Sequence, residues 1–423
     1  MTYQEALEWI HSKLAFGIKP GLERMRWMLE QLGNPQNNLS AIHVVGTNGK
    51  GSTTSYLQHI FTNSGYQVGT FTSPYIVDFR ERISIDGQMI PESDFIKLVE
   101  TVRPVVERLH LETNLEPATE FEVITVLMFY YFGNSCPVDI VIIEAGMGGY
   151  YDSTNMFKAL AVTCPSIGLD HQEVLGRTYV DIAEQKVGVL KKGVPFVYAN
   201  NRQDVEEVFQ IKAKETHSQT YRLHNDFYIK EEENYFNYIG PQANIDHIQL
   251  QMPGHHQVSN ASIAITTSLL LRDKYPKLTL QTIKDGLEMT KWVGRTELIF
   301  PNVMIDGAHN NESVDALVQV IKKYQQKNVH ILFAAINTKP IESMLESLSS
   351  IAPVSVTSFD YPKSINLDKY PKAYTRVSDW KKWLHDINLI SDKDFYVITG
   401  SLYFISQVRQ ELLLIKTTTT KKG

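Results

Sequence analysis

A glycine-rich turn between an apolar segment and a helical segment is the feature that most limits how this chain can fold. Residues 43–53 read HVVGTNGKGST, in which three glycines surround a lysine and hydroxyl side chains follow. Glycines let backbone N–H groups approach phosphate oxygens closely, while the lysine and the N-terminus of the next helix add positive charge. The stretch therefore predicts a strand, a phosphate-binding loop and a helix, the opening unit of a mostly parallel α/β sheet.

The spacing of this loop differs from the G-x-x-x-x-G-K-[ST] pattern of kinase-type loops. Val44 stands where the first glycine belongs, and Ser52 lies two residues after Lys50. A glycine-rich turn that serves packing alone is the alternative interpretation, which the lysine and the flanking pattern disfavour. We expect Lys50 to contact the β- and γ-phosphates of a nucleotide, within a binding loop formed by Thr47, Asn48, Gly49, Lys50, Gly51 and Ser52.

The composition excludes several classes of protein. Of the 423 residues, 43% are hydrophobic and 21% charged, which is ordinary for a globular chain of about two or three domains. The net charge of −6 provides no basic surface for nucleic acid. Cys136 and Cys164 are too few for a disulfide framework or a cysteine metal site, which fits a reducing compartment. Lacking an apolar leader or a run of about 18 apolar residues, the sequence predicts a cytoplasmic protein that does not contact membranes.

Alternating apolar strands and amphipathic helices predict two α/β domains. In the first domain, buried strands are expected at 41–45, 67–71, 138–144, 160–164 and 194–199. Short polar and apolar alternations over 219–252 predict a small antiparallel sheet attached to that domain. Because a second α/β series begins near residue 298, we place a P-loop domain at 1–295 and a smaller Rossmann-like domain at 296–423.

Ionisable side chains follow several of the expected strands, where ligands of open α/β sheets bind. Glu144 ends an apolar strand and is expected to hold Mg²⁺, although alone it would only cap the next turn. His171 is equally consistent with a ligand and with a structural histidine, and a solvated side chain is the default interpretation for Lys186. Asp306 and His309 would either face an interdomain cleft or cap the next helix. These residues indicate an ATP- and Mg²⁺-dependent enzyme, but they do not identify its substrate.

Taken in order, the motifs of this chain resemble those of folylpolyglutamate synthases and bifunctional dihydrofolate synthases, within the Mur ligase superfamily. The likeness covers nearly the whole length. It is carried by Gly46–Ser52, Thr72–Pro74 with Arg80–Arg82, Glu144 with Gly146, Gly148 and Gly149, Asp152–Asn155, Gly168–His171 with Leu175 and Gly176, Ile182 and Ala183 with Lys186 and Gly188, Gly254 with His256, Gln257, Asn260 and Ala261, Gly294 and Arg295 with Glu297, Asp306–Asn310, and Thr399–Tyr403.

The resemblance implies an ATP-driven amide ligation. A folate carboxylate would take the γ-phosphoryl group, and the amine of L-glutamate would then attack the acyl phosphate. It further implies two Mg²⁺ ions, with metal ligands at Ser73, Glu144 and His171, and carbamylation of Lys186, which would turn a cation into a metal-binding anion. Reduced folate or dihydropteroate is the expected carboxylate substrate, and a monomer is the expected state.

The resemblance also assigns residues outside the phosphate loop. Arg295, Asp306 and His309 match positions that contact ATP or support ligation, and Asn260 matches a position on the adenine side. Thr119 and Phe121 lie on a helix that resembles the dihydropteroate-binding region, and Arg82 and Ser401 are further expected substrate contacts. The chain departs from the family pattern at Tyr75, Tyr150, Tyr151, Gln185, Asn311 and the segment 337–340, none of which removes an expected metal or phosphate group.

Two other functions are compatible with parts of this pattern. A Mur-type cell-wall peptide ligase would share the phosphate loop and the lysine, but it normally has a sugar-nucleotide domain ahead of the loop, for which about 45 residues are too few. A nucleotide-binding regulator without ligase activity would fit the departures, but it would not explain the retention of His171, Lys186 and Asp306.

Overall fold

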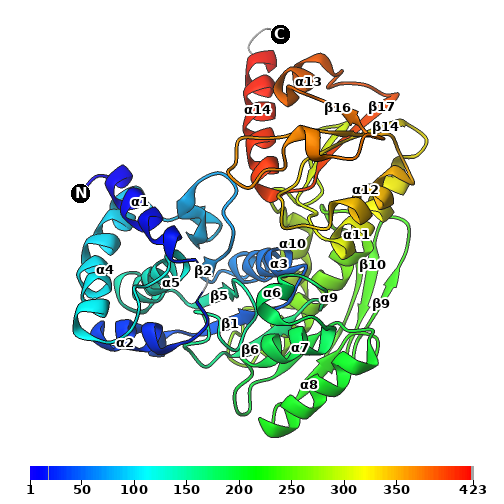
Figure 1. Ribbon diagram of the computed structural model, residues 1–423. Coiled ribbons are helices and arrows are strands. Elements are labelled where there is room, and N and C mark those ends of the chain that lie inside the picture. Colours follow the sequence, from blue (N-terminus) through cyan, green and yellow to red (C-terminus); the bar gives the residue numbers. More distant parts are fainter. Residues whose placement is uncertain (18, 421–423) are drawn as a thin grey trace. The chain divides into compact units, whose positions relative to one another are not determined.

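The computed structural model describes residues 1–17 and 19–420, and the chain divides into two units (Figure 1). The N-terminal unit comprises Met1–Leu250 and Val258–Thr290, and the C-terminal unit comprises Gln251–Gln257 and Lys291–Gly423. We expected a single boundary at residue 295, whereas this division falls at 291 and assigns the short segment 251–257 to the C-terminal unit as well. None of the described helices is long and apolar enough to span a membrane.

The N-terminal unit is built on an eight-stranded sheet with the order β4-β3-β2-β5-β1-β6-β7-β8. The six strands from β2 to β8 in this order are parallel, and β3 and β4 add an antiparallel edge. The central strands are apolar and buried, as expected for strands covered on both faces. The strands are β1 (Ala41–Val44), β2 (Val68–Phe71), β3 (Ile83–Ile85), β4 (Gln88–Met89), β5 (Ile140–Glu144), β6 (Ala161–Cys164), β7 (Phe196–Tyr198) and β8 (Thr220–Arg222).

Helices of this unit pack on the sheet and on one another. Side chains of α1, α2, α4 and α5 share one apolar core with the strands, while α3 packs on β1, β2 and β5 and against α10. The helices are α1 (Tyr3–His11), η1 (Ser12–Phe16), α2 (Glu23–Gln31), η2 (Pro35–Asn38), α3 (Lys50–Asn63), η3 (Phe79–Arg82), α4 (Glu92–Glu112), α5 (Glu120–Tyr130), η4 (Tyr131–Ser135), α6 (Gln172–Leu175), α7 (Tyr179–Val187), α8 (Gln203–Glu215), α9 (His255–Leu270), whose first three residues are assigned to the C-terminal unit, and α10 (Leu280–Met289).

The small antiparallel sheet has three strands in the order β11-β10-β9. They are β9 (Tyr228–Glu231), β10 (Phe236–Ile239) and β11 (Asn244–Ile248). The expected range of 219–252 is too wide for this sheet, because β8 pairs with β7 and extends the large parallel sheet instead. An isolated three-residue strand carries too short an alternation to reveal which sheet it joins.

The C-terminal unit holds a six-stranded sheet with the order β12-β13-β17-β14-β15-β16, parallel except for β12. Its elements are β12 (Glu297–Phe300), β13 (Val303–Asp306), α11 (Asn311–Ile321), η5 (Lys322–Tyr324), β14 (Asn328–Phe333), α12 (Ile341–Ser349), β15 (Val354–Val356), η6 (Leu367–Lys369), β16 (Thr375–Arg376), α13 (Trp380–Asp386), β17 (Asp394–Thr399) and α14 (Leu402–Thr420). Together, the two units confirm the predicted fold class: a mostly parallel P-loop domain with a small antiparallel sheet, followed by a smaller Rossmann-like α/β domain.

Candidate active site

The predicted phosphate loop joins β1 to α3 and lies at the carboxyl edge of the large sheet. Gly46 and Gly49 have φ angles of 137° and 87°, which favour glycine. An ideal Cβ atom on Gly49 would lie 2.5 Å from Oδ1 of Asn260 on α9, and one on Gly46 would lie 3.1 Å from the carbonyl oxygen of Ser166. The loop therefore needs glycine at both positions because its backbone is approached from two sides. The side chain of Asn260, for which the resemblance implies a position on the adenine side, lies against the phosphate loop.

The segment that follows β6 braces this loop with a set of hydrogen bonds. The N–H of Thr47 donates to the carbonyl of Ser166 (2.9 Å), and the N–H of Asn48 donates to the Ser166 hydroxyl (2.9 Å). The hydroxyl of Thr47 donates to the carbonyl of Gly168 at 3.0 Å. Sequence reasoning gave Ser166 no role, because one serine after a strand has no distinctive signal. These bonds hold the loop in one conformation before any ligand arrives, which lowers the ordering cost of binding.

Two lysines meet on one carbonyl oxygen of the phosphate loop. Nζ of Lys50 donates to the carbonyls of Gly46 (3.1 Å) and Thr47 (3.2 Å), and Nζ of Lys186 donates to the same Gly46 carbonyl at 2.8 Å. The default interpretation of Lys186 as a solvated lysine is wrong, since only 4% of it is exposed. Burial, assisted by the nearby charge of Lys50, lowers the pKa of Lys186 to about 7. A substantial fraction of its amine is therefore neutral near pH 7.

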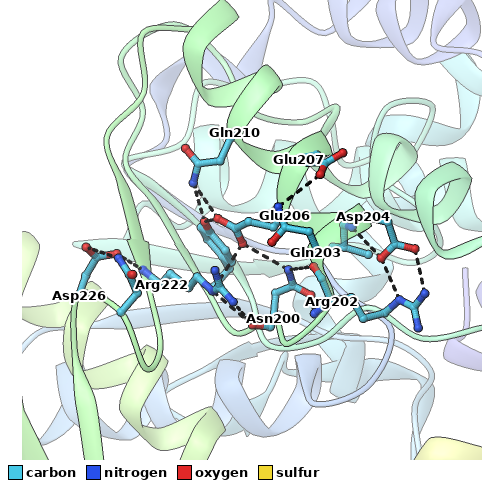
Figure 2. A network of polar contacts seen from close by, with 12 residues as sticks. Asn200, Arg202, Gln203, Asp204, Glu206, Glu207, Gln210, Arg222 and Asp226 are labelled. Atoms are coloured by element: carbon cyan, nitrogen blue, oxygen red, sulfur yellow. Dashed lines mark hydrogen bonds and ion pairs between the residues drawn. The ribbon is translucent and has the colours of Figure 1, made fainter.

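Helix α7, which carries Lys186, is fixed at its start by contacts with the next βα unit. Thr178 and Asp181 form a capping box there, and the guanidinium of Arg202 lies 4.0 Å from the ring centroid of Tyr179. Figure 2 shows the polar network around Arg202 and Glu206, in which Glu206 accepts a hydrogen bond from Asn200 at 3.3 Å. Lys186 is thus placed by a helix whose first turn is fixed by its own capping box and by the contact between Arg202 and Tyr179.

The expected metal ligands follow the ends of neighbouring strands. Glu144 is the last residue of β5, is buried, and pairs in register with Val44, two residues before Gly46. His171 precedes α6 with a φ of 51°, and its side chain is 42% exposed. In the described part of the chain, no three His, Cys, Asp or Glu side chains form a metal-binding group. Mg²⁺ usually takes only one or two protein carboxylates and completes its shell with phosphate oxygens and water.

A buried series of hydrogen bonds supports the glycine-rich loop after β5, and the sequence predicts no chemical role for the side chains in it. Asp152 accepts hydrogen bonds from the N–H of Met147 (2.7 Å) and from the hydroxyl of Thr154 (2.6 Å). That hydroxyl is 2.8 Å from Nε2 of His43 on β1, so the imidazole must donate to it. Burial lowers the pKa of His43 to about 3, which keeps the ring neutral. A histidine inside an otherwise apolar strand is the sequence signal that points to such a series.

The expected substrate residues gather around the start of α5. Thr119 is buried and caps the helix by accepting from the N–H of Glu122, while Phe121 packs against Gly146. The guanidinium of Arg82 lies 5.4 Å and 5.1 Å from the ring centroids of Tyr75 and Phe79. Arg82 also lies 3.7 Å from the carboxylate of Glu120 on α5, so three of the four expected substrate residues lie in one region, and the fourth, Ser401, lies in the C-terminal unit.

The C-terminal unit presents its own cluster where β13 ends. Asp306 is buried, and its two carboxylate oxygens accept hydrogen bonds from the N–H groups of Ala308 (2.8 Å) and Thr296 (2.7 Å). Burial raises the pKa of Asp306, although the charge of Arg295 opposes that shift. His309 donates from Nδ1 to the carbonyl of Gly307 at 2.7 Å, which fixes its tautomer.

Arg295 contacts the same turn, since its Nη1 lies 3.4 Å from the Gly307 carbonyl. Ser401, at the end of β17, is buried and follows Gly400, whose φ is 116°. β17 pairs with β13, so Thr399 lies opposite Asp306. Arginine, acid, histidine and serine therefore share the carboxyl edge of the C-terminal sheet.

Comparisons with known proteins identify the family to which this chain belongs. The Mur ligase middle domain matches residues 44–268, and the Mur ligase glutamate ligase domain matches residues 294–402. The dihydrofolate synthase/folylpolyglutamate synthase of Bacillus subtilis is 37% identical over 97% of this chain and 99% of its own length. The folylpolyglutamate synthase (FPGS) of Lacticaseibacillus casei is 34% identical over 98% of this chain and 99% of its own length.

Solved structures resemble the whole chain as well. An FPGS–AMPPCP–folate complex superposes with a TM-score of 0.85 at 33% identity, covering 98% of this chain and all of that one. The family matches span both units, and the relatives span nearly the full length. The chain belongs to the Mur ligase family, among the ATP-dependent ligases of the folylpolyglutamate synthase and dihydrofolate synthase group.

Proposed function

We propose that this enzyme adds L-glutamate to the glutamyl carboxylate of a reduced folate through an acyl phosphate, and that it acts as a monomer in the cytoplasm. The observation that carries the proposal is the convergence of Lys50 and Lys186 on the Gly46 carbonyl. It places two cationic or nucleophilic amines at the loop that would hold the ATP phosphates. An FPGS relative that binds both AMPPCP, an ATP analogue, and folate supports the same pair of substrates.

The reaction balances in two steps. A carboxylate oxygen of the folate attacks the γ-phosphorus of ATP, the bond to the β-phosphate oxygen breaks, and ADP leaves. The neutral amine of glutamate then attacks the acyl carbon, the carbon–oxygen bond to phosphate breaks, and the amine gives up a proton as the amide forms. Phosphorylation is needed because a free carboxylate has no adequate leaving group. In this scheme Lys50 offsets the charge that develops during phosphoryl transfer.

Two Mg²⁺ ions would neutralise the phosphate oxygens, held by Ser73, Glu144 and His171 together with a carbamate on Lys186. Three of these four donors, Ser73, Glu144 and the carbamate, offer oxygen, which suits this hard cation, and Glu144 ends a buried strand beside the phosphate loop. Carbamylation requires that a neutral lysine amine attack the carbon of CO₂ and release a proton. The lowered pKa of Lys186, about 7, supports that step because an ordinary lysine is almost fully protonated there.

The C-terminal cluster would complete the site. We assign Arg295 and Asp306 to the nucleotide, and Asp306 and His309 to the ligation step. Asp306 is suited to an orienting role, because both of its oxygens are already fixed by backbone N–H groups. Thr47, Asn48, Gly49, Gly51, Ser52 and Asn260 would complete the nucleotide site around Lys50.

The carboxylate substrate would bind near Thr119, Phe121 and Arg82, and we also assign Ser401 to substrate binding. Whether dihydropteroate is accepted alongside reduced folate decides between a monofunctional and a bifunctional enzyme. A paired assay of glutamate-dependent ADP release tests this. Release with tetrahydrofolate is the expected result, and release with dihydropteroate as well would establish both activities. Nucleotide binding without release for either substrate would overturn the proposal in favour of a regulator.

A further inference from the structure

The first turn of α5 is held by two arginines that come from separate segments of the N-terminal unit. Arg24, on α2, donates from Nε to both carboxylate oxygens of Glu122, at 2.9 and 3.1 Å. Arg82, on η3, lies 3.7 Å from the carboxylate of Glu120. Glu120 and Glu122 flank Phe121 in the sequence, so the two arginine contacts bracket the turn at which the carboxylate substrate is proposed to bind.

The contact made by Arg24 is the more buried of the two and it joins more groups. Only 9% of the Arg24 side chain and 2% of the Glu122 side chain are exposed. The carboxylate of Glu122 also accepts from the N–H of Thr119 at 2.8 Å, which completes the cap of α5. A second nitrogen of Arg24, Nη2, donates to the backbone carbonyl of Lys19 at 2.7 Å. One guanidinium therefore connects the cap of α5 to the chain that precedes α2.

Packing alone does not explain a charged pair at this position. The desolvation of two ions is costly, and apolar side chains of similar volume often fill such a space at no loss of stability. Apolar side chains cannot form the three directional bonds that fix Thr119, Glu122 and Lys19 relative to one another. Lys19 is further held by an ion pair of 2.7 Å with Glu116. The Arg24–Glu122 pair thus fixes the conformation of the first turn of α5.

We propose that Arg24 is a positioning residue for the folate substrate, acting through Glu122 on the first turn of α5 and through the Lys19 backbone on the neighbouring chain. This inference rests on the proposed function, which assigns Thr119 and Phe121 to that substrate. The phosphate loop is braced independently, by Ser166 and Gly168. Loss of Arg24 should therefore weaken binding of the folate and leave binding of the nucleotide unchanged.

The test compares steady-state kinetics of four variants with the wild type: Arg24→Met, Arg24→Lys, the double variant Arg24→Met/Glu122→Leu, and Arg108→Met as a matched control. Arg108 also forms an ion pair with a glutamate, Glu112, and donates a hydrogen bond to Gln31 on α2. Unlike Arg24, it is exposed, and neither of these two partners belongs to α5. We expect Arg24→Met to raise KM for tetrahydrofolate about tenfold or more, with KM for ATP within about twofold of the wild-type value. Arg24→Lys should recover part of the loss, and Arg108→Met should behave as wild type.

The double variant separates positioning from stability. It removes both buried charges, so it should fold even if Arg24→Met, which leaves the Glu122 carboxylate unpaired, does not. A raised KM for tetrahydrofolate in the folded double variant supports the inference. A wild-type KM in that variant, or parallel rises of KM for tetrahydrofolate and ATP, would overturn it while the ligase activity of the wild type stands. An inactive wild type would instead overturn the proposed function, and the inference with it.

Discussion

The carboxyl edges of the two sheets carry opposite chemistry. In the N-terminal unit, two lysines donate to one carbonyl of a glycine-rich loop, which suits phosphate. In the C-terminal unit, a buried aspartate has both oxygens occupied by backbone N–H groups and lies beside an arginine and a histidine. We propose that the first edge supplies most of the contacts to the nucleotide, whereas the second mainly offers groups that orient and stabilise reacting atoms. Nucleotide binding and ligation should therefore be separable by mutation.

The largest expected effect comes from Lys186→Ala, which removes the buried amine at the phosphate loop. We expect the rate of ligation to fall by about 10²- to 10³-fold, because a positioned group near developing charge is lost. ADP should still bind, since Lys50 and the braced loop remain. Ligation measured with and without a small carboxylate such as acetate also tests the proposed carbamate, which predicts partial rescue by the carboxylate.

Lys191→Met provides the matched control for this experiment. Lys191 is half-buried, has a pKa lowered by burial, and donates to a backbone carbonyl, that of Phe157. It lies outside the phosphate loop, so its loss should leave the rate of ligation near the wild-type value. Equal losses in the two variants would mean that burial of a lysine, and not its place beside Gly46, is what matters.

In the C-terminal unit, Asp306→Asn should lower kcat by about 10²-fold with a much smaller change in Kd for ADP. The amide nitrogen of asparagine would face a backbone N–H where an oxygen now accepts, which should also cost about 1–3 kcal/mol of stability. Stopped-flow turnover and calorimetric binding of ADP would measure the two effects. Asp315→Asn, an exposed acid on α11 bonded only to Ser347 among the bonds described, is the control. An equal loss of ADP affinity and turnover would show that the two edges are not separable.

A smaller effect is expected for Gly49→Ala, which alters the N-terminal edge alone. The new Cβ would meet the side chain of Asn260 at 2.5 Å, so KM for ATP should rise about tenfold as the loop shifts. Gly193→Ala is matched in backbone conformation, with a φ of 75° against 87°, but has no atom within 4 Å of the added Cβ. Both variants should lose about 1 kcal/mol of stability. A rise of KM in both would assign the effect to general strain.

The last expected effect is a pH dependence of stability that arises from Lys186. Its folded pKa of about 7 lies below its ordinary value of 10.5, so between these values the unfolded chain holds more protons. The free energy of unfolding should therefore rise with pH across this window, by up to about 1.4 kcal/mol per pH unit relative to Lys186→Met. Urea unfolding in CO₂-free buffer measures the difference. Parallel pH profiles for the two proteins would argue against a perturbed Lys186.

Much of this architecture is predictable from the sequence because its signals are local. Glycine spacing marks the phosphate loop, and the apolar run ending in Glu144 marks a central strand with an acid at its edge. Lys186 shows the limit of such reasoning. The pattern of α7 alone allows a solvated lysine, and burial is decided by the loops after β1 and β5, which are distant in sequence.

The supporting contacts were beyond prediction for the same reason. Arg24 and Glu122 are 98 residues apart, and His43 on β1 is 111 residues from Thr154 in the loop after β5. Single polar residues have no periodicity, so nothing in the sequence pairs them. The sheet to which β8 belongs was predicted wrongly for a different reason. Its three residues are all half-buried, and such a short segment does not reveal which of the two sheets it extends.

The central claim is that the folate carboxylate becomes an acyl phosphate before glutamate attacks. Its most direct test uses tetrahydrofolate labelled with oxygen-18 in the glutamyl carboxylate, with ATP, Mg²⁺ and L-glutamate, followed by mass spectrometry of the released phosphate. The mechanism predicts that each phosphate released with a new amide carries one labelled oxygen, because the carboxylate oxygen that attacks phosphorus leaves with it. Amide formation accompanied by unlabelled phosphate would contradict the mechanism.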